Sequence, residues 1–390
     1  MRWATEGAMI RTSIHPIGRR RGFTLIELLV AAAICVIIMT VLATAFQIGI
    51  DTMRQMRSAG DMADQLRAAN EVMRRDLSAN MFIPEEGKPN GGTVLSNQRF
   101  DLGDASPIGG FFLLSSPDPT SEGVDSDSFA STRTTNHVLQ FTSITPQTSA
   151  HGEQTLFTAT SPPAPTVVGG QTINPTTYSS PAAEIVYFLA PIPTNPPTSP
   201  PLATFTDATN TMQLFNLIRR QRLVATNDDA VFALKTPVTL LPTDQSDSDV
   251  ISVSPSTGLV NTMRSLAVKA NRLNPSAINP ISTAGRIGED VLLSNVISFE
   301  VKLSWSSLPA NTGTFPNPRP FLSPNTDFPF DSLGSFSALS NSTFDTAPAA
   351  PQTFSAIDKL QIRARAIQIR LRVFDPKLQT ARQSTIIQSF

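Results

Sequence analysis

The fold of this chain is decided by one stretch near its N-terminus, Arg19-Arg20-Arg21-Gly22-Phe23-Thr24-Leu25-Ile26-Glu27-Leu28-Leu29-Val30. Three arginines and a glycine precede an apolar run that contains a single carboxylate, Glu27. From Leu28 to Phe46 the chain has 19 residues without a charge. As a helix they span about 28 Å, which matches the hydrocarbon core of a bilayer at roughly 30 Å. A carboxylate at the edge of such a span is costly in lipid, so Glu27 requires a specific explanation.

Basic residues before the apolar run predict the orientation of the span. Residues 1–22 contain five arginines and one glutamate. A basic flank of this kind predicts a cytoplasmic N-terminus and export of everything after Ile50. Met9 is an alternative start that retains four of the arginines.

The motif resembles the prepilin signal of type IV pilins and type II secretion pseudopilins. In that family a membrane-embedded prepilin peptidase cuts after the glycine and methylates the new N-terminal residue. The resemblance implies cleavage between Gly22 and Phe23 and N-methylation of Phe23. It also implies that Glu27, the fifth residue of the mature chain, neutralises the N-terminal amine of a neighbouring subunit as helices stack in a filament. Loss of either partner would leave a charge stranded in lipid.

Two other interpretations of this stretch remain open. Any single-pass anchor has an apolar run, and polar residues are tolerated near its ends. Residues 20–23 also resemble a twin-arginine export signal, with Ala43-Thr44-Ala45 as its small-residue cleavage site. That alternative leaves Glu27 unexplained. N-terminal sequencing separates the two signals, because one predicts methylated Phe23 and the other predicts Phe46.

Bulk composition excludes some functions and sets limits on how the exported part is stabilised. The formal net charge is −1, so the chain has no electrostatic footprint for nucleic acid. The single cysteine, Cys35, lies inside the apolar span, so no intrachain disulfide is available. The exported part must therefore be held together by burial, for which the phenylalanines, 23 in the whole chain, are the expected source.

A helical pattern continues beyond the span. No proline occurs between Phe23 and Ile83. Apolar or small residues recur at a spacing close to 3.5, with charged residues between them. We predict one helix from about Phe23 to Asn80, whose first half crosses the membrane and whose second half lays an apolar stripe on a globular domain. The stripe comprises Met53, Met56, Ala59, Gly60, Ala63, Leu66, Asn70, Met73 and Leu77.

Later segments have the alternation or composition of β-strands. Ile362, Ala364 and Ala366 are out of phase with the alternation that begins at Ile367, which predicts a bulge near Ala366-Ile367. Segments that are apolar on one face fit an antiparallel sheet packed against the helix, so the predicted fold class is α+β. The candidate strands are 138–144, 184–189, 214–224, 299–305 and 367–373.

The predicted organisation has four parts and two insertions rich in proline and serine, which are expected to form loops. The parts are a leader at 1–22, the transmembrane half of the helix at 23–50, its amphipathic half at 51–80 and an exported β-rich domain at 81–390. The insertions are 161–201 and 306–352.

A second, looser resemblance concerns the minor pseudopilin J group and the W-type minor pilins. Arg75-Asp76-Leu77 resembles the Arg-Asp-Leu element that closes the stem of that group. The segment 184–189 followed by 214–222 resembles its tyrosine strand and the arginine pair that comes next. Segments 290–305 and 366–375 then follow in the same order as in that group.

Residues that could carry catalysis or bind metal are sparse. After cleavage only His137 and His151 remain, without metal-ligand spacing, and no nucleophile or nucleotide motif is present. No catalytic residue, cofactor or metal is therefore predicted. The best calcium candidates are 125–127 and Asp244, Asp247 and Asp249, but solvated turn acids are the favoured interpretation. One cluster of basic residues is interpreted as the solvent-exposed (wet) face of a strand, where its charges would keep a sheet edge soluble. This cluster is Arg219-Arg220-Gln221-Arg222.

Together these features predict a minor pilin or pseudopilin in the cytoplasmic membrane, with a periplasmic or surface-exposed domain. Its expected partners are prepilin peptidase, other pilins or pseudopilins, and an inner-membrane assembly platform with its ATPase; no nucleic acid is expected. A bulky domain suits the tip of a filament better than its shaft. One alternative is an adhesin or binding module that uses the pilin stem only as an anchor. Another is an exported enzyme on a cleavable signal.

Overall fold

A computed structural model describes most of the regular elements of the chain. Contacts divide the chain into a unit at 1–59 and a unit at 60–390, which are described separately below. The leader up to Arg21, His151 and both calcium candidates lie outside the described residues. The described residues are 22–87, 89–98, 107–115, 136–145, 156–161, 166–168, 171–173, 176–192, 204–206, 211–225, 250–254, 260–273, 289–307, 343–346, 362–376 and 380–390.

One long helix, α1 (Leu25–Ser78), confirms the predicted helix to within two residues at each end. In the first unit every side chain from Phe23 to Arg57 is exposed. The predicted stripe is wrong for Met53 and Met56, which are 69% and 70% exposed.

In the second unit the helix presents a buried stripe. Leu66, Met73 and Leu77 are buried as predicted. Met62 and Ala69 are also buried and complete a spacing of three to four residues, which puts all five on one helical face. The stripe also contains Asp76, a charged residue that the apolar pattern did not predict to be buried.

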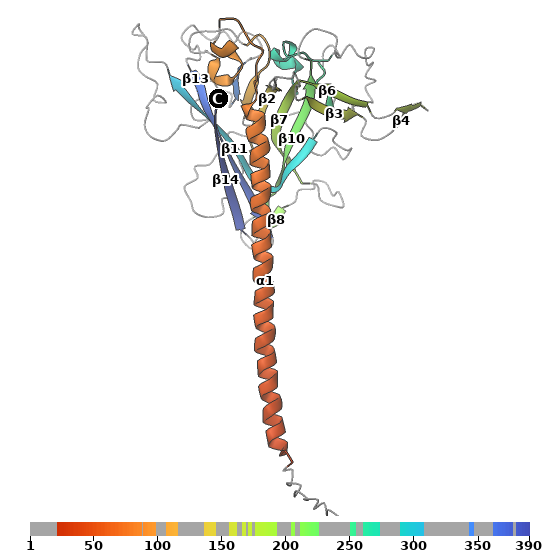
Figure 1. Ribbon diagram of the computed structural model, residues 1–390, viewed down its shortest axis with the longest axis vertical. Coiled ribbons are helices and arrows are strands. Elements are labelled where there is room, and N and C mark those ends of the chain that lie inside the picture. Colours follow the sequence, from red (N-terminus) through yellow and green to blue (C-terminus); the bar gives the residue numbers. More distant parts are fainter. Residues whose placement is uncertain are drawn as a thin grey trace, which may run out of the picture. The chain divides into compact units, whose positions relative to one another are not determined.

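An eight-stranded antiparallel sheet forms the centre of the second unit, with the order β12-β1-β2-β7-β10-β11-β13-β14 (Figure 1). Three two-stranded sheets, β3-β6, β4-β5 and β8-β9, accompany it among the described residues. The strands are β1 (Phe112–Ser115), β2 (Val138–Ile144), β3 (Phe157–Ser161), β4 (Thr166–Val168), β5 (Gln171–Ile173), β6 (Thr176–Ser180), β7 (Ala182–Pro191), β8 (Thr204–Thr206), β9 (Thr211–Gln213), β10 (Phe215–Val224), β11 (Glu289–Ser307), β12 (Thr343–Asp345), β13 (Ile362–Asp375) and β14 (Thr380–Ser389).

All five predicted strands are confirmed, and so is the predicted bulge. Ser304 pairs with Ala366 while Trp305 pairs with Ala364, so Arg365 is an extra residue in β13. β11 continues through both of the segments that the sequence suggested, 290–296 and 299–305. It is bent where its register with β10 shifts, near Asn295, whose φ of 57° suits an asparagine at a bulge.

The sheet differs from the sequence-based expectation in two places. The insertion 161–201 was expected to form a loop apart from the predicted strand 184–189, but it contains the whole of β7, an interior strand whose residues from Ala182 to Ala190 are all buried. β14 was not predicted, because its sequence has only two adjacent large apolar residues, Ile386 and Ile387, and no clear alternation.

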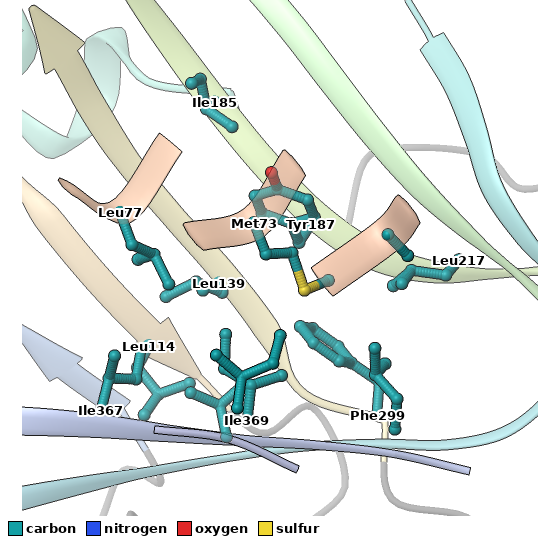
Figure 2. Close-up of a cluster of buried hydrophobic side chains, with 14 of the residues drawn as sticks. Met73, Leu77, Leu114, Leu139, Ile185, Tyr187, Leu217, Phe299, Ile367 and Ile369 are labelled. Atoms are coloured by element: carbon teal, nitrogen blue, oxygen red, sulfur yellow. The ribbon is translucent and has the colours of Figure 1, made fainter. Parts of the chain in front are cut away.

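The main core lies between the helical stripe and one face of the sheet. Figure 2 shows Met73 and Leu77 of α1 facing side chains from six strands. Fully burying an aliphatic side chain of this size contributes about 1.5–3 kcal/mol. The packing of helix on sheet in this α+β fold therefore depends on the buried helical stripe. Its residues Leu66, Met73 and Leu77 were predicted from the helical period of the sequence. The strand residues labelled around them are Leu114, Leu139, Ile185, Tyr187, Leu217, Phe299, Ile367 and Ile369.

A second, smaller core is formed where the segment 260–273 packs on the sheet. Met263 and Leu266 of this segment are buried with Phe111, Leu113 and Val224. This segment therefore belongs to the folded domain although it contains only short helical turns, at 265–267 and 269–271.

Candidate functional site

Helix α1 begins with a capping box built from Thr24 and Glu27. The backbone N–H and the hydroxyl of Thr24 both donate to Glu27 Oε2, each at 3.0 Å. The Glu27 N–H donates back to Thr24 Oγ1 at 3.3 Å. A threonine at the N-cap with a glutamate three residues later satisfies two of the orphan N–H groups of a helix start. This reciprocal arrangement fixes where the helix begins.

The capping box satisfies hydrogen bonds of Glu27 but does not neutralise its charge. All of its bonds come from uncharged groups of Thr24, and Oε1 has no partner among the described residues. The helix N-terminus favours a negative charge, but only in part. The charge of Glu27 is therefore not balanced by a cation among the described residues.

Gly22 and Phe23 precede the helix in an exposed position. Phe23 is 86% exposed. A Cβ added to Gly22 would meet nothing within 4 Å, so the fold of the described residues does not require a glycine there.

The helix that follows is long and apolar enough to cross a membrane, judged by its length and composition. The qualifying stretch has none of its residues buried within the protein. Within it, the hydroxyls of Thr40 and Thr44 donate to carbonyls one turn earlier, Thr40 to Val36 at 2.8 Å and Thr44 to Thr40 at 2.9 Å. The polar atoms of these threonines are thereby satisfied without water.

At the other end of α1, Asp76 joins the helix to two interior strands. Tyr187 of β7 donates its hydroxyl to Asp76 Oδ2 at 2.6 Å. Arg219 of β10 donates from Nε to the same oxygen at 2.6 Å. All three side chains are at least 95% buried, so this is a desolvated ion pair with a third hydrogen-bonding member.

The surroundings keep this cluster in one protonation state. Burial and the Asp76 carboxylate raise the pKa of Tyr187 well above its ordinary value of 10.0, so its hydroxyl remains a donor. Burial alone would lower the pKa of Arg219, but the contact with Asp76 raises it overall. The guanidinium therefore stays charged and the pair stays intact.

The remaining arginines of β10 are also buried, which corrects the prediction that they form the wet face of an edge strand. β10 lies between β7 and β11 and is not an edge. Arg220 faces Glu289, with NH1 and Oε1 3.5 Å apart. Arg222 donates from Nε to Glu184 Oε2 at 3.0 Å. The four-residue pattern looked solvent-exposed because sequence alone does not reveal partner carboxylates on neighbouring strands.

Glu184 is fully buried and surrounded by donors. Gln140 donates to Oε1 at 2.7 Å and the Leu273 N–H donates to it at 3.0 Å. Ser252 donates to Oε2 at 2.8 Å. Burial would raise the pKa of Glu184, but Arg222, the Leu273 N–H and Ser252 lower it overall. The carboxylate, in its ionised form, thus ties two segments outside the sheet, 250–254 and 260–273, to the sheet.

The described residues provide no candidate active site or metal centre. His137 is fully buried, and its Nδ1 accepts the Val301 N–H at 2.9 Å, as expected for an interior structural histidine. Among the described residues no group of three or more His, Cys, Asp or Glu is arranged to hold a metal.

Residues 17–43 match the family model of the prokaryotic N-terminal methylation motif. The matched range contains Gly22, Phe23 and Glu27. It identifies a type IV pilin-like signal and indicates a processed, pilin-like structural subunit. Such a signal implies processing by prepilin peptidase and assembly with other pilins. Searches of curated proteins and of solved structures gave no match.

The motif and the apolar helix α1 together fit a protein anchored in the inner membrane. Sequence reasoning identified the signal but missed the capping box that Thr24 forms with Glu27. The spacing Thr24-x-x-Glu27 at the start of an apolar run is a capping-box signature and would have revealed it.

Proposed function

We propose that this chain is a minor pilin or pseudopilin that is cleaved between Gly22 and Phe23, methylated on Phe23 and assembled into a type IV pilus-like or type II secretion filament. The N-terminus faces the cytoplasm and the domain from Gly60 onward is exported. Work for assembly comes from an inner-membrane platform and its ATPase.

One observation carries the proposal: the motif at 17–43 leads directly into a helix whose residues are exposed as far as Arg57. Such an apolar surface requires lipid or other helices around it. Glu27 lies at the start of that surface with its charge uncompensated by the described residues. The amine created by cleavage at Phe23 of a neighbouring subunit supplies the missing cation.

Support for the J-like or W-like subgroup comes from the residues of the second resemblance. Asp76, Tyr187 and Arg219 belong to three separate segments of that resemblance, and they meet in one buried contact. A tip position is supported by the size of the domain, since a large sheet is difficult to fit along a tightly packed shaft.

The test of the assembly role is Glu27→Ala in the full chain. Insertion into the membrane should be unchanged, while incorporation into filaments should fall sharply. Glu71→Ala is the matched control, because Glu71 is an exposed glutamate on the same helix. Normal incorporation of Glu27→Ala would refute the charge-neutralisation account.

A second test distinguishes a filament subunit from an adhesin that only borrows the stem. Deletion of the whole gene should impair assembly or secretion by the machine that it serves. If deletion leaves both intact and removes only attachment to cells or glycans, the adhesin interpretation replaces this proposal.

A further inference from the structure

The two edges of the eight-stranded sheet differ in length and protection. β12 has three residues, and its Asp345 is bound to Arg272 at 2.9 Å. β14 has ten residues, all paired with β13 in one continuous register. No described strand lies on its other side (Figure 1). A long, regular edge strand presents a row of N–H and C=O groups that can pair with another chain.

The register identifies which groups face outward. The Phe390 N–H donates to the Arg365 carbonyl at 3.1 Å, so position 390 points its backbone groups toward β13. In an antiparallel pair these groups alternate in direction along the strand. The outward-facing positions are therefore 381, 383, 385 and 387. All four are exposed, whereas the intervening Ile386 is buried.

This edge lacks the usual protection against strand addition. β14 contains no proline, glycine or lysine, and its pairing with β13 has no bulge. Its only charged residue is Arg382, which is exposed and makes no ion pair within the described part of the chain.

The surroundings of the edge are basic. β13 contributes Arg365, Arg370 and Arg372. Asp375 is the acid of the same strand, and Glu300 of β11 lies 3.0 Å from Arg370 and 2.8 Å from Lys302, so basic residues outnumber acidic ones along this part of the sheet. An incoming strand with carboxylates would be attracted to this edge, and one with lysines would be repelled.

We propose that β14 accepts an acidic, extended segment of another protein as a ninth strand of the sheet. Backbone hydrogen bonds to positions 381–387 supply affinity. A carboxylate near Arg382 and an apolar side chain near Ile387 supply specificity. A second copy of β14 is a poorer occupant, because it brings another arginine and no carboxylate. The inference does not depend on processing at Gly22.

The test uses the full-length protein in detergent micelles and a fluorescent eight-residue peptide of alternating valine and threonine with two glutamates. Fluorescence anisotropy should show this peptide binding about tenfold or more tightly than the same peptide with lysines. N-methylation of its alternate amides should weaken binding by well over tenfold, since it removes several backbone hydrogen bonds and each contributes about 1 kcal/mol.

Position 385 offers a matched pair of variants. Thr385→Pro removes an outward N–H without removing a bond to β13, so the domain should melt at an unchanged temperature while peptide binding falls about tenfold. Thr385→Val retains the N–H and should bind like the unmodified protein. Equal binding of the acidic and lysine peptides, or normal binding by a folded Thr385→Pro, would overturn the proposal. So would trapping of a dimer through Gln383→Cys in a Cys35→Ser background, because that result identifies a second copy as the occupant.

Discussion

Two carboxylates on the same helix, Glu27 and Asp76, differ in whether the described residues supply a cation to them. Asp76 is 3% exposed and is bound by Arg219 and Tyr187 of its own domain. The bonds of Glu27 in the described structure come only from uncharged groups of Thr24. The globular domain thus neutralises its buried charge internally. We infer that the membrane part leaves this task to a second chain.

The largest expected effect is on the internally compensated carboxylate. Asp76→Asn leaves the Arg219 guanidinium buried without its counter-ion, which should cost about 3–5 kcal/mol of folding free energy. Urea unfolding of the full chain in detergent measures this loss. Asp64→Asn is the control, because Asp64 pairs with Arg67 on the exposed side of the same helix and should change stability by less than about 0.5 kcal/mol. Equal losses of folding free energy in the two variants would mean that the buried Asp76–Arg219 pair contributes no more to stability than the exposed Asp64–Arg67 pair.

Glu184→Gln should have the next largest effect. It removes the negative charge opposite Arg222 while keeping the size of the side chain, at a cost of about 3 kcal/mol. Thermal unfolding followed by circular dichroism measures the difference. A stability equal to that of the unmodified protein would show that the buried guanidinium does not need this carboxylate.

The pH dependence of stability isolates the charge of Glu184. Its pKa is lower in the folded protein than its ordinary value of 4.5. Its contribution is therefore complete above about pH 4.5 and is lost as the pH falls toward the lower folded-state pKa. Stability of the unmodified protein should decline in that acid range, and Glu184→Gln should show a shallower decline. Parallel curves for the two proteins would contradict this assignment.

Tyr187→Phe should have a smaller effect, about 2 kcal/mol, because it removes one hydrogen bond to a charged acceptor and keeps the ring in the core. In an Asp76→Asn background the same change should cost less, since the acceptor is no longer charged. A double-mutant cycle measures this coupling, and strict additivity would show that the two residues act independently.

The smallest effect is expected at the start of the helix. Thr24→Val removes the hydroxyl that donates to Glu27, but the Thr24 backbone N–H donor remains in the variant. Filament incorporation should therefore fall only partly, compared with the sharp loss expected for Glu27→Ala. Immunoblots of assembled subunits measure the incorporation of each variant into filaments. A defect of Thr24→Val as large as that of Glu27→Ala would contradict the account, because it would show that assembly depends on the Thr24 hydroxyl more than on the charge of Glu27.

The sequence predicted the features that depend on local periodicity. The helix, five strands and the bulge at Arg365 could all be read from spacing, because the 3.6 and 2.0 periods are properties of single segments. The Met53 and Met56 prediction was wrong because a helical period continues whether or not a surface is present to pack on it.

The charge network could not be predicted in the same way. Asp76 is 111 residues from Tyr187 and 143 residues from Arg219 in the sequence. No local pattern links positions so far apart, and an arginine-rich strand looks solvent-exposed until its partner acids are placed. β14 was missed for a related reason, since Ile386 is its one buried residue and a single buried position imposes no alternation on the sequence.

The most direct test of the central claim is mass spectrometry of the N-terminus of the native protein isolated from its membrane. Processing at the signal predicts a chain that starts at Phe23 and carries one methyl group on its amine. A chain that starts at Phe46, or one that retains its arginine-rich leader, would contradict the account.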